Sequence, residues 1–99
     1  MQKTKAEKQF NPSTAQLICR GQWPVIFHSD NGRIEQTRMA TRTIYRTSEG
    51  RYFLHDKFTN GQFADQITPQ PPSKARLRQK QLLSYAEQFK TEYHELATI

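Results

Sequence analysis

Four cations lie close together in the C-terminal third of the chain, where their spacing predicts an anion-binding site. We predict a helix over residues 73–97 that is capped by Ser73, which places these cations at its N-terminal end. The helix dipole favours acidic side chains there, by about 0.3–1 kcal/mol per exposed charge. Cations that oppose the dipole beside free backbone N–H groups are typical of a phosphate site. The four are Lys74, Arg76, Arg78 and Lys80.

Arginine is also concentrated on three predicted strands that precede this helix. Because its planar fork binds phosphate and carboxylate through paired hydrogen bonds, arginine favours such partners. Aromatic residues between the arginines are typical of a surface on which nucleic-acid bases stack. Side chains alternate along a strand, however, so Arg42 and Arg46 share a face with Ile44 while Tyr45 points the other way. The arginines are Arg33, Arg38, Arg42, Arg46 and Arg51, and the aromatics are Tyr45, Tyr52 and Phe53.

The predicted binding surface therefore combines the cations of the helix start with the arginines of the sheet. Its expected partner is nucleic acid or an acidic protein. Each group has a plainer interpretation: the helix start is a solvated charged turn, or its cations pair with acids of the sheet. The sheet arginines are equally consistent with an exposed face beside Glu35, Glu49 and Asp56. The predicted binding residues are Arg38, Arg42, Arg46, Arg51, Lys74, Arg76, Arg78 and Lys80.

The run His55-Asp56-Lys57 raises the question of catalysis. Small basic ribonucleases place histidine, lysine, arginine and tyrosine around a phosphate, and His28 ends another predicted strand. Adjacent residues of a strand point to opposite faces, so Asp56 cannot orient His55. The sequence favours binding over catalysis, and we assign no catalytic residue.

The sequence predicts neither a metal nor a cofactor site. The three histidines are far apart in sequence, and Cys19 is the single cysteine. One cysteine excludes an internal disulfide and the usual cysteine-based zinc sites. Because cysteine is among the most often buried residues, we expect Cys19 to be structural rather than nucleophilic.

Turn residues at short intervals predict an antiparallel meander of three to five strands over residues 22–67. Asn31-Gly32 and Asn60-Gly61 are hairpin signals, and Gly50 suits a left-handed bulge position. On the strand Arg51–Phe58, we expect Tyr52, Leu54 and Phe58 on one face and Phe53, His55 and Lys57 on the other. Residues 62–67 fit a short edge strand.

The segments on either side of this sheet complete an α+β fold. Residues 1–10 read as a flexible basic arm, and residues 12–20 fit either a short helix that stops at Gly21 or a short strand. Residues 68–72 read as a stiff proline-rich linker. The long C-terminal helix carries an apolar seam that we expect to pack on the sheet rather than to form a coiled coil. The seam residues are Leu82, Ala86, Phe89, Tyr93 and Leu96.

Size and composition indicate one small basic domain, over residues 11–99. The chain has 99 residues and a net charge of +6, from 15 Lys plus Arg against 9 Asp plus Glu. A basic balance makes nucleic acid or an acidic protein a natural partner. No apolar run approaches the roughly 20 residues that cross a bilayer, so we expect no membrane partner. The charged N-terminal residues do not resemble a signal peptide, and we expect a cytoplasmic protein.

Three functions are compatible with these features. The first is a non-enzymatic module that contacts nucleic acid or a nucleoprotein complex. The second is a protein-interaction module, such as a small bacterial or phage inhibitor or regulator of a larger enzyme. The third is a small ribonuclease. The expected oligomeric state is a monomer, or a weak homodimer through the C-terminal helix.

Overall fold

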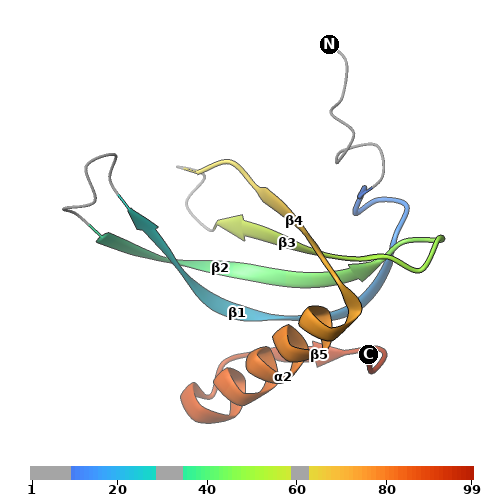
Figure 1. Cartoon of the computed structure of the whole chain (residues 1–99). Helices are drawn as coiled ribbons and strands as arrows, with labels where there is room; N and C mark the ends of the chain where they lie inside the picture. The colour runs from blue at the N-terminus through green and yellow to red at the C-terminus, as the bar shows by residue number, and fades with distance from the viewer. Residues whose placement is uncertain (1–9, 29–34, 59–62) are drawn as a thin grey trace.

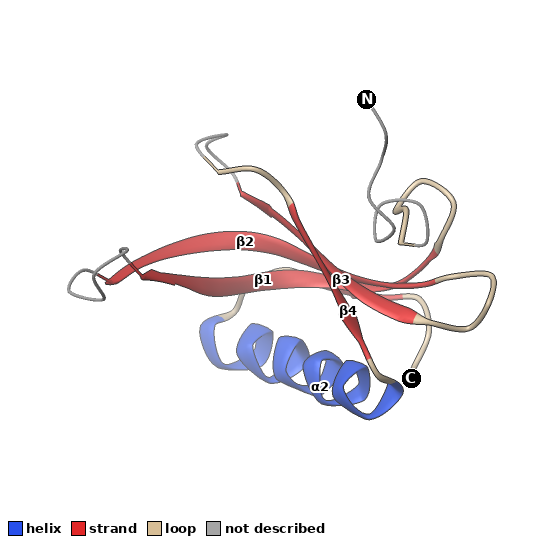
Figure 2. Cartoon of the chain, turned by 45° about the horizontal axis from the view of Figure 1, so that its top comes forward, coloured by secondary structure: helices blue, strands red, loops and turns tan. Residues whose placement is uncertain are grey.

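The computed structural model describes residues 10–28, 35–58 and 63–99. These residues form a five-stranded antiparallel sheet in the order β4-β3-β2-β1-β5. The strands are β1 (Gln16–His28), β2 (Glu35–Arg46), β3 (Tyr52–Phe58), β4 (Gln66–Gln70) and β5 (Tyr93–Glu95), and the helix α2 spans Pro72–Phe89. The helix lies against one face of the sheet (Figures 1 and 2), which confirms the predicted α+β fold.

The larger of two apolar clusters lies between α2 and the sheet. The α2 side chain Leu82, only 1% exposed, packs there against Ile44 of β2 and Leu54 of β3. Ile18 and Cys19 of β1 complete this cluster. The helix packs chiefly on β1, and the core beneath it reaches across β2 to β3.

A second cluster lies on the helix-free face of the sheet. Tyr45 and Phe53 stack there with ring centroids 5.2 Å apart, and Phe10 meets Phe53 edge-on at 5.6 Å. Tyr45 follows Ile44, and Phe53 precedes Leu54, so strand alternation sends these neighbours to opposite cores. Phe10, at the end of the predicted flexible arm, is instead buried in the fold.

The turn between β2 and β3 agrees with its sequence signal. Gly50 has a φ angle of 84°, the left-handed conformation predicted for it. The N–H of Thr47 donates to the Arg51 carbonyl at 2.7 Å, and the N–H of Gly50 donates to the Thr47 carbonyl at 2.9 Å. The signals Asn31-Gly32 and Asn60-Gly61 lie outside the described residues.

The C-terminal helix is shorter than predicted and begins differently. It ends at Phe89, where Lys90 adopts a left-handed conformation, instead of continuing to residue 97. Its N-cap is Pro71, and Ser73 makes no capping hydrogen bond. Leu82 and Ala86 of the predicted seam are buried, but Phe89 is 56% exposed and Tyr93 and Leu96 lie beyond the helix.

The chain leaves the helix because residues 93–95 add an edge strand to β1, paired with Cys19–Gly21. Gly21, which the sequence suggested as a helix stop, lies inside β1 and leaves room for the ring of Tyr93. A Cβ atom on Gly21 would lie 3.3 Å from Tyr93 Cδ2. This long-range pairing outweighs the local tendency of residues 90–97 to remain helical.

Gln79 fixes the segment that follows β5. Its side-chain amide donates to the Ala97 carbonyl at 2.8 Å, and its Oε1 accepts from the Ile99 N–H at 2.9 Å. The same amide nitrogen is 3.1 Å from a carboxylate oxygen of Glu95. Gln79 is 5% exposed. Its buried side chain therefore satisfies backbone groups of Ala97 and Ile99 that a neighbouring strand would otherwise pair with.

The remaining segments agree with the sequence prediction only in part. Residues 16–20 are strand, which was one of the two open alternatives. Strand β2 is continuous from Glu35 to Arg46. Pro69 pairs with Phe53 inside β4 rather than lying in a linker, and a sheet edge tolerates proline because its missing N–H can face outward.

Among the described residues, α2 lacks the continuous apolar stretch that a membrane-spanning helix needs, and no other helix qualifies.

The exposure of the helical apolar residues predicts unequal costs of truncation. Leu82→Ala should lower the free energy of unfolding by about 2–5 kcal/mol, because it removes a fully buried side chain. Phe89→Ala should lower it by less than about 1 kcal/mol, since over half of the ring is already in water. Urea unfolding of both variants measures this, and equal losses would show that Phe89 belongs to the core.

The Gln79 clamp predicts a local effect at the C-terminal segment. Gln79→Ala should cost about 2–4 kcal/mol, because it leaves the part-buried backbone groups of Ala97 and Ile99 without partners. It should also release residues 96–99 to carboxypeptidase, followed by mass spectrometry. Gln88→Ala, an exposed glutamine of the same helix, is the control. Equal protection in the two variants would contradict the clamp.

Candidate functional site

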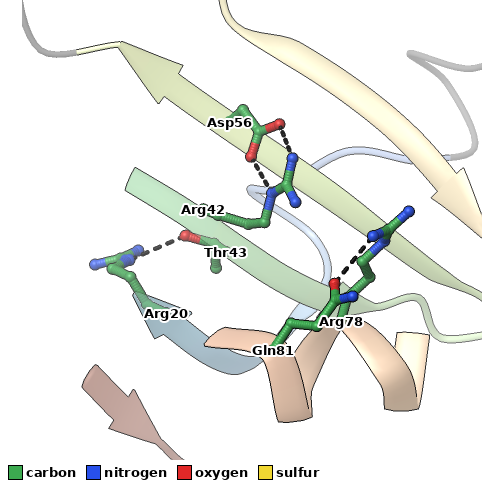
Figure 3. A network of polar contacts seen from close by, with 6 residues as sticks. All are labelled: Arg20, Arg42, Thr43, Asp56, Arg78 and Gln81. Carbon is green, nitrogen blue, oxygen red and sulfur yellow. Dashed lines mark hydrogen bonds and ion pairs between the residues drawn. The ribbon is translucent and has the colours of Figure 1, made fainter. Parts of the chain in front are cut away.

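Arg42, a predicted phosphate ligand, is already paired inside the protein. Its Nε and Nη2 donate to the two carboxylate oxygens of Asp56 at 2.7 and 2.9 Å (Figure 3). Its guanidinium carbon lies 5.6 Å from the Trp23 ring centroid. The side chains of Arg42 and Asp56 are only 11% and 2% exposed. Arg42 therefore neutralises a buried carboxylate on the helix side of the sheet.

The other sheet arginines do not converge on one place. Arg38 lies toward the far end of β2, where its Nη2 donates to Gln36 Oε1 at 3.2 Å. Arg46 and Arg51 are exposed at opposite sides of the β2–β3 turn. Of the aromatics thought to interleave with them, Tyr45 and Phe53 are buried and Tyr52 packs toward the helix-side core. The described surface therefore offers no platform of these rings for base stacking.

The cations at the start of α2 also point in different directions. Residues four apart share a side of a helix, so Lys74 goes with Arg78 and Arg76 with Lys80. Arg78 lies on the flank toward the sheet, where its Nη1 donates to Gln81 Oε1 at 2.9 Å. Arg76 lies toward the C-terminal segment, and its Nε is 3.4 Å from the Ile99 carbonyl. The helix start therefore presents two pairs rather than one cluster of four.

A cleft of about 340 Å³ separates α2 from β3 and β4. Arg42, Asp56 and Trp23 line it from the sheet, and Arg78 lines it from the helix. Because the Arg42–Asp56 pair is neutral, Arg78 is the one lining residue that adds net charge.

A second hollow, of about 330 Å³, lies on the helix-free face and has a mainly polar lining. Two cations, Arg20 and Lys57, line it together with the imidazole of His55. Neither cation has a carboxylate of the described residues within ion-pair distance. Three hydroxyl-bearing residues complete the lining: Thr41, Thr43 and Tyr45. This hollow combines cations and hydroxyl groups in the way that a phosphate group requires.

Strand register explains why these residues meet. Arg20 of β1 is paired with Thr43 of β2, and Thr43 is paired with His55 of β3, so the three form a row across the sheet. Arg20 Nε donates to Thr43 Oγ1 at 3.1 Å (Figure 3). Lys57 lies two residues along β3 from His55, on the same face. Arg20 and Lys57 are both exposed, so their charges are accessible to a partner.

The carboxylate that contacts His55 belongs to Asp65 and not to Asp56. His55 Nε2 lies 3.0 Å from Asp65 Oδ2, and the two side chains are 18% and 47% exposed. Asp56 points to the opposite face, as strand alternation predicts. The partner of His55 comes from a residue ten positions later, which only the antiparallel pairing of β3 with the following segment brings close.

Cys19 and Tyr93 lie on the other side of the sheet, next to each other. Burial raises the pKa of the Cys19 thiol to about 11, and the nearby carboxylate of Glu95 adds to this rise. Burial likewise raises the pKa of Tyr93, as does its 2.7 Å hydrogen bond to Glu95. Both groups therefore stay neutral near pH 7, and Cys19 lacks the thiolate of a nucleophilic cysteine. Within the described residues, no three His, Cys, Asp or Glu side chains are grouped to hold a metal ion.

The fold thus separates the predicted binding residues. The hollow is built around Arg20 and Lys57, with Asp65 in contact with its histidine, and that predicted set did not contain these three residues. Arg20 lies in a segment whose sequence fits either a helix or a strand. The pairing of Arg20 with Thr43 of β2 therefore could not be predicted. Lys57 was placed on the correct face beside His55, but no pairing linked it to Arg20. Comparison with known proteins adds nothing to this geometry, since no family model, curated protein or solved structure matches the chain.

The buried pair predicts a non-additive effect on stability. Arg42→Met should cost about 3–5 kcal/mol, because Asp56 then keeps a buried charge without a partner. The double variant Arg42→Met/Asp56→Leu should recover most of that loss, because neither charge remains. Urea unfolding at pH 7 measures both, with Arg46→Met as an exposed control on the same strand. The single variant Asp56→Leu completes the cycle, and simple additivity of the two single substitutions would contradict the buried ion pair.

Proposed function

We propose that this protein is a nucleic-acid-binding module that holds the phosphate backbone in the hollow on the helix-free face of its sheet. The supporting observation is the convergence of Arg20 and Lys57 on one hollow without carboxylate partners among the described residues. Phosphate contacts of this kind supply most of the affinity of non-specific nucleic-acid binding.

The chemistry of the hollow favours phosphate over the bases. Arg20 and Lys57 offer charged donors, and the hydroxyl groups of Thr41 and Thr43 offer further donors to non-bridging oxygens. The aromatic rings of this face are largely buried under Phe10, so they are poor partners for base stacking. We expect binding that depends strongly on salt and weakly on sequence.

The net charge of the whole chain supports the same proposal. An excess of six positive charges attracts a polyanion from a distance and raises the rate of encounter. The cations at the start of α2 are the competing source of positive charge: Lys74, Arg76, Arg78 and Lys80. Because Lys74 and Arg76 are exposed, removing their charges is a matched control for the hollow.

The test compares two double variants that lose the same charge. Arg20→Gln/Lys57→Gln should weaken binding to a labelled single-stranded oligonucleotide at least about tenfold, and it should lower the salt slope by about 1.4, because two phosphate contacts are lost. Lys74→Gln/Arg76→Gln should change the affinity much less. Fluorescence anisotropy between 50 and 200 mM salt measures both quantities.

Each other outcome counts against the proposal. Equal weakening in the two double variants would mean that net charge alone attracts the oligonucleotide. A larger effect of Lys74→Gln/Arg76→Gln would move the site to the helix start. Absence of binding by the unmodified protein, even at 50 mM salt, would overturn nucleic-acid binding and favour the alternative of a protein-interaction module.

A further inference from the structure

His55 has the surroundings of a catalytic base rather than those of a simple surface histidine. It lines the hollow that holds Arg20 and Lys57, and its Nε2 contacts a carboxylate oxygen of Asp65 at 3.0 Å. Its side chain is 18% exposed, so the ring is partly sheltered but open to the hollow. Tyr45 lies beside it, with ring centroids 6.3 Å apart.

The contact with Asp65 fixes the roles of the two ring nitrogens. A carboxylate accepts hydrogen bonds. In the neutral imidazole, Nε2 therefore carries the proton and donates a hydrogen bond to the Asp65 carboxylate. Nδ1 is then unprotonated and can accept a proton from a substrate. This is the arrangement in which a carboxylate orients a general base.

The cations of the hollow lie where negative charge would grow on a phosphate. Arg20 and His55 stand on strands that flank β2, about 10 Å apart at their Cα atoms by strand spacing. A phosphodiester between them would meet Arg20 on one side, Lys57 on the other and the base Nδ1 from β3. Fixed cations of this kind stabilise the doubly negative phosphorane of phosphoryl transfer.

We propose that the hollow cleaves RNA by internal transphosphorylation, with His55 as the general base; this inference rests on the proposed function. His55 Nδ1 removes the proton of a ribose 2′-hydroxyl, and the 2′ oxygen forms a bond to the adjacent phosphorus. The bond from phosphorus to the 5′ oxygen breaks, and that oxygen takes a proton from solvent water. His55 returns its proton to solvent, so the products are a 2′,3′-cyclic phosphate and a 5′-hydroxyl.

Asp65 acts as a positioning residue in this reaction, and DNA is not a substrate. Asp65 never touches the RNA, but it holds the imidazole in the reactive tautomer. DNA lacks the 2′-hydroxyl, so it binds in the hollow and stays intact. The site is therefore specific for RNA in the chemical step, although binding alone does not distinguish the two polymers.

The experiment uses a DNA oligonucleotide with one ribonucleotide, incubated with the full chain in the presence of EDTA. The unmodified protein should cut only after the ribose and leave a cyclic phosphate, identified by mass spectrometry. His55→Ala should lower the rate by at least about 10²-fold, as is typical for a lost general base, while binding by anisotropy stays within about threefold. Added imidazole should restore part of the activity.

Matched variants separate this role from structural effects. His28→Ala removes a histidine that also faces a carboxylate, Glu35 at 3.5 Å, but lies outside the hollow, and it should cleave like the unmodified protein. Asp65→Asn should lower kcat with little change in KM, and Asp65→Glu should recover part of the loss. His55→Gln serves if circular dichroism shows that His55→Ala is unfolded.

Four results would overturn the inference. Binding of the chimeric oligonucleotide without cleavage would remove catalysis and leave the proposed function standing. Equal cleavage by His55→Ala and by the unmodified protein, purified in parallel, would assign the activity to a contaminant. Cleavage of the all-DNA oligonucleotide would exclude the 2′-hydroxyl mechanism. Absence of both binding and cleavage would reject the inference and the proposed function together.

Discussion

One helix has to serve a five-stranded sheet, and this imbalance governs the rest of the molecule. A helix of 18 residues is about 27 Å long and 10 Å wide, so it covers about two strands. It packs mainly on β1, and beside it the same face carries the buried Arg42–Asp56 pair and Trp23, which line the cleft between the helix and the sheet. The opposite face receives no helix from the described residues. There Phe10 covers the rings of Tyr45 and Phe53, and the polar remainder faces solvent.

The parts of the fold that local sequence encodes were predictable. The alternation of β3 separates Leu54 from Phe53, the left-handed position of Gly50 follows from its lack of a side chain, and Pro71 and Pro72 mark the start of α2. The end of the helix was not predictable, because Tyr93–Glu95 leaves the helical path only to pair with a strand made of residues 16–28. No local signal announces a partner more than seventy positions away.

The candidate site shows the same division between local and distant information. Strand alternation correctly excluded Asp56 as the partner of His55 and put Arg42 on the face of Ile44. It could not identify Asp65, because that contact depends on how the segment after β3 returns to the sheet. Counting arginines was misleading for a physical reason: a buried carboxylate needs a counter-ion, and Arg42 fulfils that need inside the fold. The cations that remain available to a partner are those, such as Arg20 and Lys57, that form no ion pair with a carboxylate of the described residues.

The pairing of β1 with β5 has a consequence for the order in which the protein is made. Cys19 is synthesised early, and its strand partner Glu95 follows 76 positions later, so the two cannot pair until then. At roughly 5–20 residues per second, the outer edge of β1 stays open on the ribosome for about 4–15 s. During that time its backbone N–H and C=O groups can pair with any other extended chain. The charged arginine at position 20, in the middle of this edge, makes such mispairing with a second nascent copy electrostatically unfavourable.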